Sequence, residues 1–440
     1  MTPKKILFAC VPFDGHFSPL TGLAIHLQDQ GHDVRWYVQE FYADKLRKLN
    51  IHHYPFVKAQ QINQEGLETL FPERKKFHNQ IKKLNHDIQN VFIKQGPLYY
   101  RDIVEINEEF DFDLLIADVA FVGIPYVKEL LQKPVFSVGV FPLNDTSKDL
   151  APAGLGLTPS KSFFGRRKQD ILRFVANHIL FGPSNRMSKA TLKEYGIESE
   201  VFIFDELTRR STLVLQSGSP GFEYKRSDLR SNIRFIGPLL PYSLKQHRPY
   251  RIQTRFQYDN IVLVTQGTVE KDVNKIIVPT LEAFKNTKTL VIATTGGSKT
   301  QELRNKYPQE NFIIEDFIPF ADILPFCDAY ITNGGYGGVM LGIMNKVPMV
   351  VAGIHEGKNE ICARVGYFKL GINLRTEMPS PIQIKRAVTA VISDKTYTRN
   401  VSKLAREFSQ YNPHVLLDKY MSELFGESRI IYRKQRSQLV

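Results

Sequence analysis

The run of residues from Asp328 to Glu360, DAYITNGGYGGVMLGIMNKVPMVVAGIHEGKNE, constrains the fold more than any other part of the sequence. The apolar segment 329–332 has the length of a buried strand, and a second such segment occupies 347–351. Between them, a glycine-rich loop leads into the apolar segment 339–344, which predicts a short helix. This order predicts a strand–loop–helix–strand unit of a parallel sheet.

Four glycines, Gly334, Gly335, Gly337 and Gly338, give this loop its character. Glycine lets the backbone approach a ligand closely, and the unpaired N–H groups at the following helix start favour an anion, for which a diphosphate is the natural occupant. The alternative is that the glycines only allow a tight turn. The spacing matches neither the dinucleotide fingerprint nor the P-loop, so the loop alone does not decide between these interpretations.

A chain of 440 residues is long for a single core, and two domains are expected. The segment Pro238–Pro241 and the polar residues after it predict a linker. The expected organisation is an N-terminal domain, a linker, a C-terminal domain, and a closing helix with a basic tail, at residues 1–237, 238–258, 259–410 and 411–440.

Composition bounds the compartment and the partners. Cys10, Cys327 and Cys362 are scattered, without metal-ligand or CxxC spacing, which indicates a reducing compartment. No apolar run approaches the roughly 20 residues of a membrane span, and the N-terminal ILFACVPF is better explained as a strand than as a signal peptide, so a cytoplasmic location is expected. The net charge of +13 suits nucleic acid, an anionic membrane or anionic substrates. No nucleic-acid-binding motif occurs, so nucleic acid is not expected as a partner.

The first half of the chain begins with a β–α–β pattern: strands are predicted at 6–11 and 34–38, with leucines at helical spacing between them. The loop after the first strand carries His16 at the carboxyl edge, where open α/β sheets bind ligands. Further strands are predicted at 113–118, 134–140 and 213–216, the last of this half. The strand at 113–118 ends in Asp118.

Two other segments of this half are expected to be helical. Residues 60–101 form a long insertion of the kind that covers a site. Residues 161–193 alternate apolar side chains with Lys and Arg; the favoured interpretation is a helix lining a core or an apolar pocket, and the alternative is peripheral contact with the anionic inner face of a membrane. Asp111-Phe112-Asp113 has the form of a metal-binding DxD tripeptide, but its place at a strand entry favours ordinary polar punctuation.

A second α/β series follows the linker. Strands are predicted at 261–265, 290–294 and 312–315 before the glycine-loop unit, and helices at 273–286, 381–393, 402–410 and 415–425. The chain is therefore predicted to form two α/β halves whose parallel sheets face each other across a cleft.

Several motifs occur in a specific order: His16 in GHFSP, Asp118 at a strand end, Gln266-Gly267-Thr268, Phe317-Ile318-Pro319, and TNGGYGG…VP…HEGKNE. Together they resemble the family 1 nucleotide-sugar glycosyltransferases, which include UDP-glycosyltransferases and the macrolide type. The resemblance implies a GT-B fold of two Rossmann-like domains, with the acceptor bound by the first and the donor by the second. It also implies an inverting, metal-independent reaction that needs no cofactor besides the nucleotide-sugar donor.

The resemblance also implies roles for individual residues. His16 is the general base that deprotonates the acceptor hydroxyl, and Asp118 orients this histidine and stabilises its cation. Phe317 stacks on the nucleotide base and the Ile318 backbone pairs with the base edge. The donor-binding residues are expected to be Gln266, Gly267, Thr268, Phe317, Ile318, Asn333, Gly334, Gly335, Gly337, Gly338, Glu356, Lys358 and Asn359.

Departures from the family pattern concern the donor. Asn333 stands where the family has a diphosphate-contacting histidine, and Gly337-Gly338 replace an asparagine–serine pair. Leu341 replaces the glutamate that grips both ribose hydroxyls, which admits a deoxyribose donor such as a dTDP-sugar. Gly357-Lys358 replace the Asp–Gln pair that reads sugar hydroxyls, which places glucose specificity in question.

The predicted activity is transfer of a sugar from a UDP- or dTDP-sugar to a hydroxyl of an apolar small molecule or lipid. The aromatic-rich segments 71–98 and 141–181 would build the acceptor site. Two alternatives stay open: a catalytically degenerate nucleotide-sugar-binding subunit, and a nucleotide-sugar epimerase of the same fold.

Overall fold

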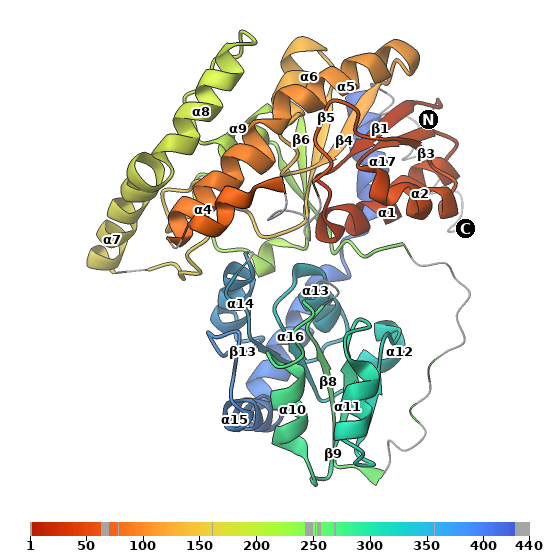
Figure 1. Cartoon of the computed structure of the whole chain (residues 1–440), viewed down its shortest axis with the longest axis vertical. Coiled ribbons are helices and arrows are strands. Elements are labelled where there is room, and N and C mark those ends of the chain that lie inside the picture. The colour runs from red at the N-terminus through yellow and green to blue at the C-terminus, as the bar shows by residue number, and fades with distance from the viewer. Residues whose placement is uncertain are drawn as a thin grey trace, which may run out of the picture.

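The computed structural model describes residues 2–62, 70–77, 79–160, 162–242, 250, 252, 257–267, 270–355 and 357–426. Two α/β units, each built on one parallel sheet, lie one above the other (Figure 1). The strand order in both sheets is that of a doubly wound fold.

The first sheet has seven strands in the order β3-β2-β1-β4-β5-β6-β7, and the six pairings between them are parallel. The strands are β1 Lys5–Ala9, β2 Asp33–Tyr37, β3 His52–Tyr54, β4 Leu114–Asp118, β5 Val135–Gly139, β6 Leu213–Ser217 and β7 Ile233–Gly237. The strand order reverses between β1 and β4, so a crevice opens at the carboxyl ends of these two strands. The prediction that 213–216 is the last strand of this half is wrong, because β7 follows; exposed Arg234 interrupts the apolar pattern of that edge strand.

The second sheet has six strands in the order β10-β9-β8-β11-β12-β13, also parallel. The strands are β8 Asn260–Thr265, β9 Thr289–Thr294, β10 Phe312–Glu315, β11 Ala329–Thr332, β12 Met349–Val351 and β13 Gly371–Asn373. The strand–glycine loop–helix–strand prediction is confirmed as β11, α13 (Tyr336–Met344) and β12. The order reverses between β8 and β11, directly before the glycine loop.

Helices cover both sheets. In the first unit they are α1 Asp14–Asp29, α2 Ala43–Lys48, α4 Gln80–Asp87, α5 Gln95–Glu109, α6 Ile124–Leu130, α7 Phe163–Phe174, α8 Gly182–Lys193 and α9 Ile203–Arg210. The later helices are α10 Ile277–Phe284, α11 Thr300–Lys306, α12 Phe320–Ile323, α14 Lys358–Tyr367, α15 Pro381–Ser393, α16 Lys395–Phe408 and α17 Pro413–Leu424. The predicted helix 381–393 coincides with α15, whose first turn carries a Ser380–Gln383 capping box.

The expectation of helix throughout 60–101 needs correction. Residues 60–62 are not helical, residues 63–69 and 78 lie outside the described residues, and a 3-10 turn at Pro72–Lys76 precedes α4. Asn79 caps α4 by accepting the N–H groups of Ile81 and Lys82. A cap at Asn79 marks a new helix start, so the helical pattern does not run through from 60.

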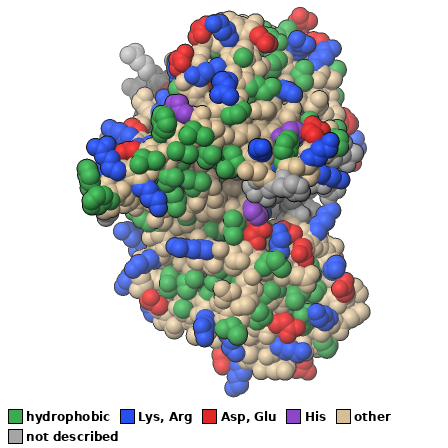
Figure 2. Space-filling model, turned by 60° about the vertical axis from the view of Figure 1, so that its left-hand side comes forward, with side chains coloured by type: hydrophobic (Ala, Val, Ile, Leu, Met, Phe, Trp, Pro, Cys, Tyr) green, Lys and Arg blue, Asp and Glu red, His purple; other side chains and the backbone are tan. Residues whose placement is uncertain are grey.

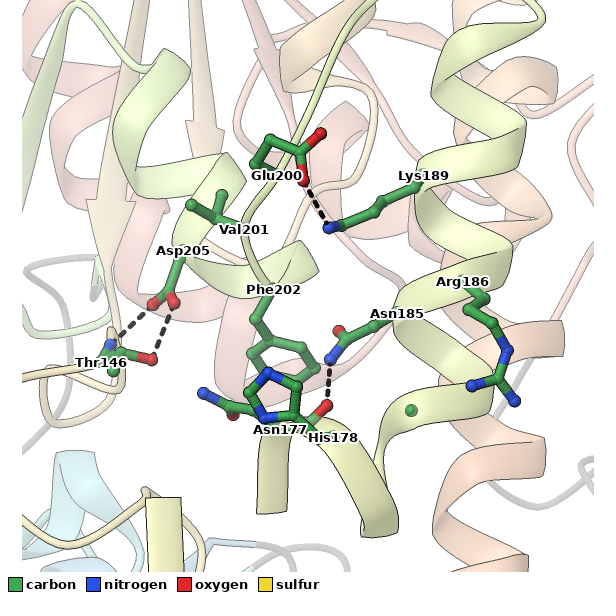
Figure 3. A pocket seen from close by; sticks show the side chains of 11 residues that line it. Thr146, Asn177, His178, Asn185, Arg186, Lys189, Glu200, Val201, Phe202 and Asp205 are labelled. Atoms are coloured by element: carbon green, nitrogen blue, oxygen red, sulfur yellow. Dashed lines mark hydrogen bonds and ion pairs between the residues drawn. The ribbon is translucent and has the colours of Figure 1, made fainter. Parts of the chain in front are cut away.

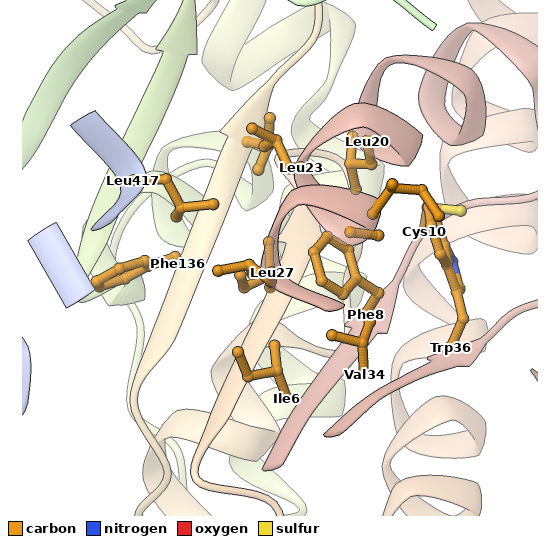
Figure 4. Packing of buried hydrophobic residues seen from close by; sticks show 14 of the residues in the cluster. Ile6, Phe8, Cys10, Leu20, Leu23, Leu27, Val34, Trp36, Phe136 and Leu417 are labelled. Carbon is orange, nitrogen blue, oxygen red and sulfur yellow. The ribbon is translucent and has the colours of Figure 1, made fainter. Parts of the chain in front are cut away.

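One of the two large core clusters of the first unit lies between its sheet and two helices from opposite ends of the sequence (Figure 4). Phe8 and Trp36 from neighbouring strands meet Leu23 of α1, and Leu417 of α17 packs into the same cluster. Helix α17 thus returns from the second unit to close the core of the first, which agrees with the expectation of a closing helix. The predicted basic tail from Arg429 lies outside the described residues.

Residues 163–193 form two helices joined by the π-helical segment η4 (Val175–Leu180), and they project from the side of the first unit (Figure 1). Helix α8 packs inward through buried Ser184, Ser188 and Leu192. Helix α7 does not: Phe163 and Phe164 are 67% and 83% exposed. The favoured prediction of a core or pocket helix is therefore wrong for α7. Within the described part of the chain, no helix has both the length and the apolar content needed to cross a bilayer.

Replacing Leu417 by alanine is expected to lower the free energy of unfolding of the first unit by about 2–5 kcal/mol, because a fully buried side chain leaves a cavity. Trp36 is the single tryptophan of the sequence and lies in the same cluster, so its fluorescence in a urea titration reports this transition. Val415→Ala, at a 56% exposed position of the same helix, is the matched control and should change stability by less than about 0.5 kcal/mol. Equal midpoints for both variants would contradict the closing role of α17.

Candidate functional site

His16 and Asp118 meet at the carboxyl edge of the first sheet. The His16 Nδ1 atom lies 2.8 Å from Asp118 Oδ1, although 102 positions separate the residues in sequence. The His16 side chain is 20% exposed and the Asp118 side chain is fully buried. The sequence predicted this pair, and the fold brings it together.

The contact follows from strand pairing. Strands β1 and β4 run side by side in register up to Ala9 and Ala117, so the residues that follow them are neighbours. Asp118 Oδ2 accepts the N–H of Val11 at 2.8 Å, and its Oδ1 also accepts the N–H of Ala120 at 2.8 Å. These backbone donors fix the orientation of the Asp118 carboxylate toward the histidine. Sequence reasoning missed these two donors, because a backbone N–H has no residue signature.

The surroundings of His16 are aromatic. The Phe141 ring lies edge-on, 5.8 Å from the imidazole centroid, and the Phe13 ring lies at 6.1 Å. Because a carboxylate accepts hydrogen bonds, this contact assigns the N–H to Nδ1 and leaves the ring lone pair on Nε2. A base of this kind beside apolar rings is suited to a hydroxyl on an apolar molecule.

The glycine loop lies at the corresponding edge of the second sheet, and helix α13, which starts there, contacts helix α1, which carries His16. Gly334 has φ +82°, and a Cβ there would overlap the Cys362 Sγ atom. A Cβ at Gly338 would lie 2.9 Å from the Tyr330 hydroxyl. These two glycines are therefore required by packing, as the tight-turn interpretation says.

The other two loop glycines leave room for a ligand. A Cβ at Gly337 would meet nothing within 4 Å, and at Gly335 the nearest atom would be Asn333 Oδ1 at 3.6 Å. Gly335 is the N-cap of α13 and offers no side chain to cap the first-turn N–H groups. An open approach to uncapped helix N–H groups is the geometry of an anion site.

Asn333 fastens the loop to the neighbouring strand. Its Nδ2 donates to the Gln266 carbonyl oxygen, and its Oδ1 accepts the Gly335 N–H at 3.3 Å. The amide nitrogen and the amide oxygen of Asn333 thus both bond within the protein, and these bonds fix the position of the loop. The Gln266 side chain is fully buried beside it, and its Oε1 has no hydrogen-bond partner among the described residues.

Two further predicted donor residues lie after β10. Phe317 is 70% exposed, whereas Ile318 is buried in the core of the second unit. Because Ile318 anchors it at the carboxyl edge of the sheet, the exposed Phe317 ring can stack on another aromatic ring. Thr268 and Glu356, both predicted donor residues, lie outside the described residues.

The start of α14 makes a contact between the two units that the sequence did not indicate. Asn359 Nδ2 donates to the Gly154 carbonyl oxygen at 2.6 Å, and Glu360 Oε1 accepts the N–H groups of Gly154 and Gly156 at 2.9 and 2.8 Å. The predicted donor residue Asn359 is thus engaged with a loop of the first unit. Lys358 lies beside it at the first position of the helix and is partly buried.

A buried arginine reinforces this contact. Arg364 Nη2 lies 2.9 Å from Glu223 Oε2, and its Nη1 lies 3.1 Å from Glu360 Oε2. The side chains of Arg364 and Glu223 are only 2% and 5% exposed. Glu223 follows the first unit's strand β6, so this network joins the two units.

Glu377 supports the loop that leads into α14, another contact without a sequence signature. Its Oε1 accepts the His355 N–H at 3.0 Å and its Oε2 lies 3.1 Å from Lys275 Nζ. Burial by itself raises the pKa of the Glu377 carboxyl, but the N–H groups of His355 and Ile354 and the Lys275 ammonium outweigh it and lower that pKa to about 2.

The DxD tripeptide lies at the opposite edge of the first sheet. Asp111 pairs with Lys133 at 2.6 Å, and Asp113 accepts the Lys5 N–H at 2.8 Å, at the amino ends of β4 and β1. Both contacts fit the interpretation that these aspartates are ordinary polar residues at the start of a strand, and not metal ligands. Within the described ranges, His, Cys, Asp and Glu side chains form no group of three or more that could hold a metal ion.

A cavity of about 370 Å³ lies elsewhere in the first unit; it contains none of the predicted catalytic or donor-binding residues, but Thr146, Asn177 and His178 of the predicted acceptor segment 141–181 line it (Figure 3). Its polar lining is largely paired with itself: Asp205 accepts from Thr146, and Lys189 lies 3.0 Å from Glu200. Burial raises the pKa of Asp205. Because Lys189 and Asp205 are already engaged within the lining, this cavity is a weaker candidate than the edge at His16.

Comparisons with known proteins agree with this geometry. Residues 280–420 match the family model described as erythromycin biosynthesis protein CIII-like, C-terminal domain. The chain is 30% identical over 407 residues to 4'-demethylrebeccamycin synthase of Lentzea aerocolonigenes, covering 92% of this chain and 96% of that protein. It is 26% identical over 434 residues to UDP-glucosyltransferase A1 of Starmerella bombicola, covering 96% and 92%. The solved structure of CalG4, the calicheamicin glycosyltransferase, matches with TM-score 0.75 at 20% identity over 98% of this chain and 100% of that chain, which confirms the GT-B fold.

The Glu377 contacts generate a pH prediction. Since the folded pKa of about 2 lies below the ordinary value of 4.5, this carboxylate stabilises the folded state fully above pH 4.5, and the contribution is lost as the pH falls toward 2. The urea midpoint of the wild type is therefore expected to be higher than that of Glu377→Gln at neutral pH, and this difference should shrink below pH 4.5. Circular dichroism follows the unfolding. Glu310→Gln, at an exposed position, is the control and should show no such trend. A wild-type advantage that is constant across this range would contradict the role of Glu377.

Proposed function

The chain belongs to the family 1 nucleotide-sugar glycosyltransferases, which move a sugar from a nucleotide sugar to a small-molecule acceptor, and we propose that His16 is its catalytic base and that the transfer inverts the anomeric carbon. The 2.8 Å contact between His16 Nδ1 and Asp118 Oδ1 carries this proposal. It leaves Nε2 as the basic nitrogen at the carboxyl edge of the first sheet, where a doubly wound sheet binds ligands.

In the proposed step, Nε2 of His16 takes the proton of the acceptor hydroxyl while its oxygen attacks the anomeric carbon. The bond from that carbon to the diphosphate oxygen breaks, and its electron pair leaves with the nucleoside diphosphate. Attack opposite the leaving group inverts the configuration. The Asp118 carboxylate stabilises the imidazolium that forms, and its backbone donors keep it oriented.

The leaving diphosphate gathers negative charge, and the proposed stabiliser is the start of α13. Its first-turn N–H groups lack a side-chain cap, and Gly335 and Gly337 leave open space above the backbone. Prearranged N–H donors stabilise developing charge without reorganisation. This arrangement requires no metal ion for the departure of the diphosphate, which supports the metal-independent form of the reaction.

The donor base is proposed to stack on Phe317, whose exposure supports that role. Leu341 of α13 packs partly buried against the core of the second unit and cannot accept a hydrogen bond from a ribose hydroxyl. A thymidine diphosphate sugar, which lacks the 2'-hydroxyl, is thus the favoured donor over a UDP-sugar. The proposed acceptor is an apolar molecule with a hydroxyl, because Phe13 and Phe141 flank His16.

The degenerate-subunit hypothesis conflicts with the preserved dyad. A binding subunit has no use for an imidazole held by a buried carboxylate that itself receives two backbone hydrogen bonds. The epimerase hypothesis is disfavoured by membership of the family, and a product assay without acceptor distinguishes it, since an epimerase would consume the donor alone.

His16→Ala is expected to lower kcat by about 10²–10⁴-fold, the usual contribution of a general base, while leaving nucleotide affinity unchanged. Asp118→Asn should lower kcat as well, because the histidine loses its oriented tautomer. The measurement is initial transfer rate with a panel of apolar hydroxyl acceptors, with nucleotide binding by calorimetry. His52→Ala, at an exposed histidine of β3, is the matched control and should keep wild-type rates. Full activity of His16→Ala would contradict the assignment.

Thermal denaturation with excess dTDP, UDP or GDP tests the donor site, because a ligand of the native state raises Tm by mass action. The shift with dTDP is expected to exceed that with UDP. Phe317→Ala should weaken nucleotide binding roughly 2- to 10-fold through loss of ring stacking, whereas Phe41→Ala, a similarly exposed phenylalanine, should not. A larger shift with UDP would overturn the Leu341 argument, and the absence of a shift with all three nucleotides would contradict the proposed donor site.

A further inference from the structure

Helix α7 presents its apolar side chains to solvent. Phe163, Phe164, Ile171 and Phe174 are 67%, 83%, 63% and 59% exposed. At about 100° per residue these four positions fall within one arc of about 100° on the helix. They form a continuous stripe, which we call the α7 stripe.

The opposite side of the helix, which packs on the protein, is the more polar one. Gln169 is buried and its Nε2 donates to the Thr158 carbonyl oxygen at 3.3 Å. Arg173, with a 14% exposed side chain, donates to the Leu150 carbonyl oxygen and to Asp170. These contacts hold the helix in its orientation, so the stripe is directed outward by specific bonds. A helix that buries its polar side and exposes phenylalanines has its apolar face available for a partner.

Basic side chains border the stripe. Arg166 and Lys168 lie on either side of it, and Arg167 lies within it, 5.5 Å from the Phe163 ring; all three are exposed. The acidic residue of the helix, Asp170, lies close to Arg173 and 3.9 Å from Arg167. Helix α7 therefore combines apolar side chains with an excess of positive charge on a part of the molecule that projects outward (Figure 1).

We propose that the α7 stripe docks this enzyme on an anionic phospholipid bilayer. Aromatic and aliphatic side chains enter the boundary between headgroups and acyl chains, and Arg and Lys at their edges pair with lipid phosphates. Hydrophobic side chains and Lys and Arg also gather on the neighbouring surface of the upper unit (Figure 2). The chain as a whole carries a net charge of +13, which attracts it to an anionic surface.

Charge decides between a bilayer and a second copy of the chain. In a two-fold dimer formed through the stripe, the same patch meets itself, so Arg166, Arg167 and Lys168 of one copy would face those of the other. Such a contact sets like charges against each other, whereas an anionic lipid surface complements all three. The docking surface includes neither His16 nor the glycine loop, so its test is independent of the catalytic roles.

The test is co-sedimentation of the full chain with vesicles of phosphatidylcholine alone and of phosphatidylcholine with phosphatidylglycerol. Preferential binding to the anionic vesicles, weakened by salt, is expected. Replacing Arg166, Arg167 and Lys168 by glutamine should lower the partition coefficient roughly a hundredfold, at about fivefold per basic side chain. Phe163→Ser with Phe164→Ser should lower it at least about tenfold, because two apolar anchors are lost.

The control variants remove the same kinds of side chain at positions outside α7. Phe41→Ser changes an exposed phenylalanine of the first unit, and Lys285→Gln, Lys288→Gln and Lys403→Gln together remove three exposed charges from the second. Both should bind anionic vesicles more tightly than the corresponding α7 variants. Absence of binding to either vesicle, or equal binding by all variants, would overturn the proposal. So would a dimer detected by light scattering that the Phe163→Ser, Phe164→Ser variant converts to monomer, because the stripe would then be a contact between copies.

Discussion

The buried guanidinium of Arg364 holds together the two units on which the active site depends. It lies 2.9 Å from Glu223 of the first unit and 3.1 Å from Glu360 of its own helix, and it packs 4.3 Å from the Tyr224 ring centroid. Removing a charge from water is costly, so such a network persists only where each ion has its partners. Because Glu360 also receives two N–H groups from the loop at Gly154 and Gly156, the same charges set the position of that loop.

Each unit contributes candidate site residues at the same topological position of its sheet. The strand order reverses between β1 and β4 in one sheet and between β8 and β11 in the other, and polar groups gather at those points. In the first unit the rule places a carboxylate beside a histidine. In the second it places uncapped helix N–H groups beside a fully buried glutamine whose Oε1 has no partner in the described part of the chain. These are the two features on which the proposed base and the proposed diphosphate site depend.

Much of the site could be predicted from sequence, because its residues sit in short motifs whose chemistry is local. His16 follows the first strand, Asp118 ends a later one, and Phe317 stands exposed where a stacking ring was expected. The glycine loop was predicted as a unit, but only packing separates Gly334 and Gly338, which close contacts require, from Gly335 and Gly337, which leave space. The contacts of Asn333 and Asn359 were not predictable, because the sequence does not show whether an asparagine side chain contacts a ligand or the protein backbone.

The sequence by itself determined the parallel α/β architecture and the candidate dyad, because hydrophobic periodicity and the residues at strand ends are properties of short segments. Only the tertiary structure decided which partners the side chains met. The buried Arg364 network, the Glu377 support of the donor loop and the return of α17 all join residues distant in sequence. Helix α7 shows the limit most clearly. Its apolar and basic residues specify an amphipathic helix, but which side faces the protein depends on the bonds of Gln169 and Arg173 to backbone carbonyl oxygens of the preceding loop. Periodicity shows that a helix is amphipathic, but tertiary packing determines which face is buried.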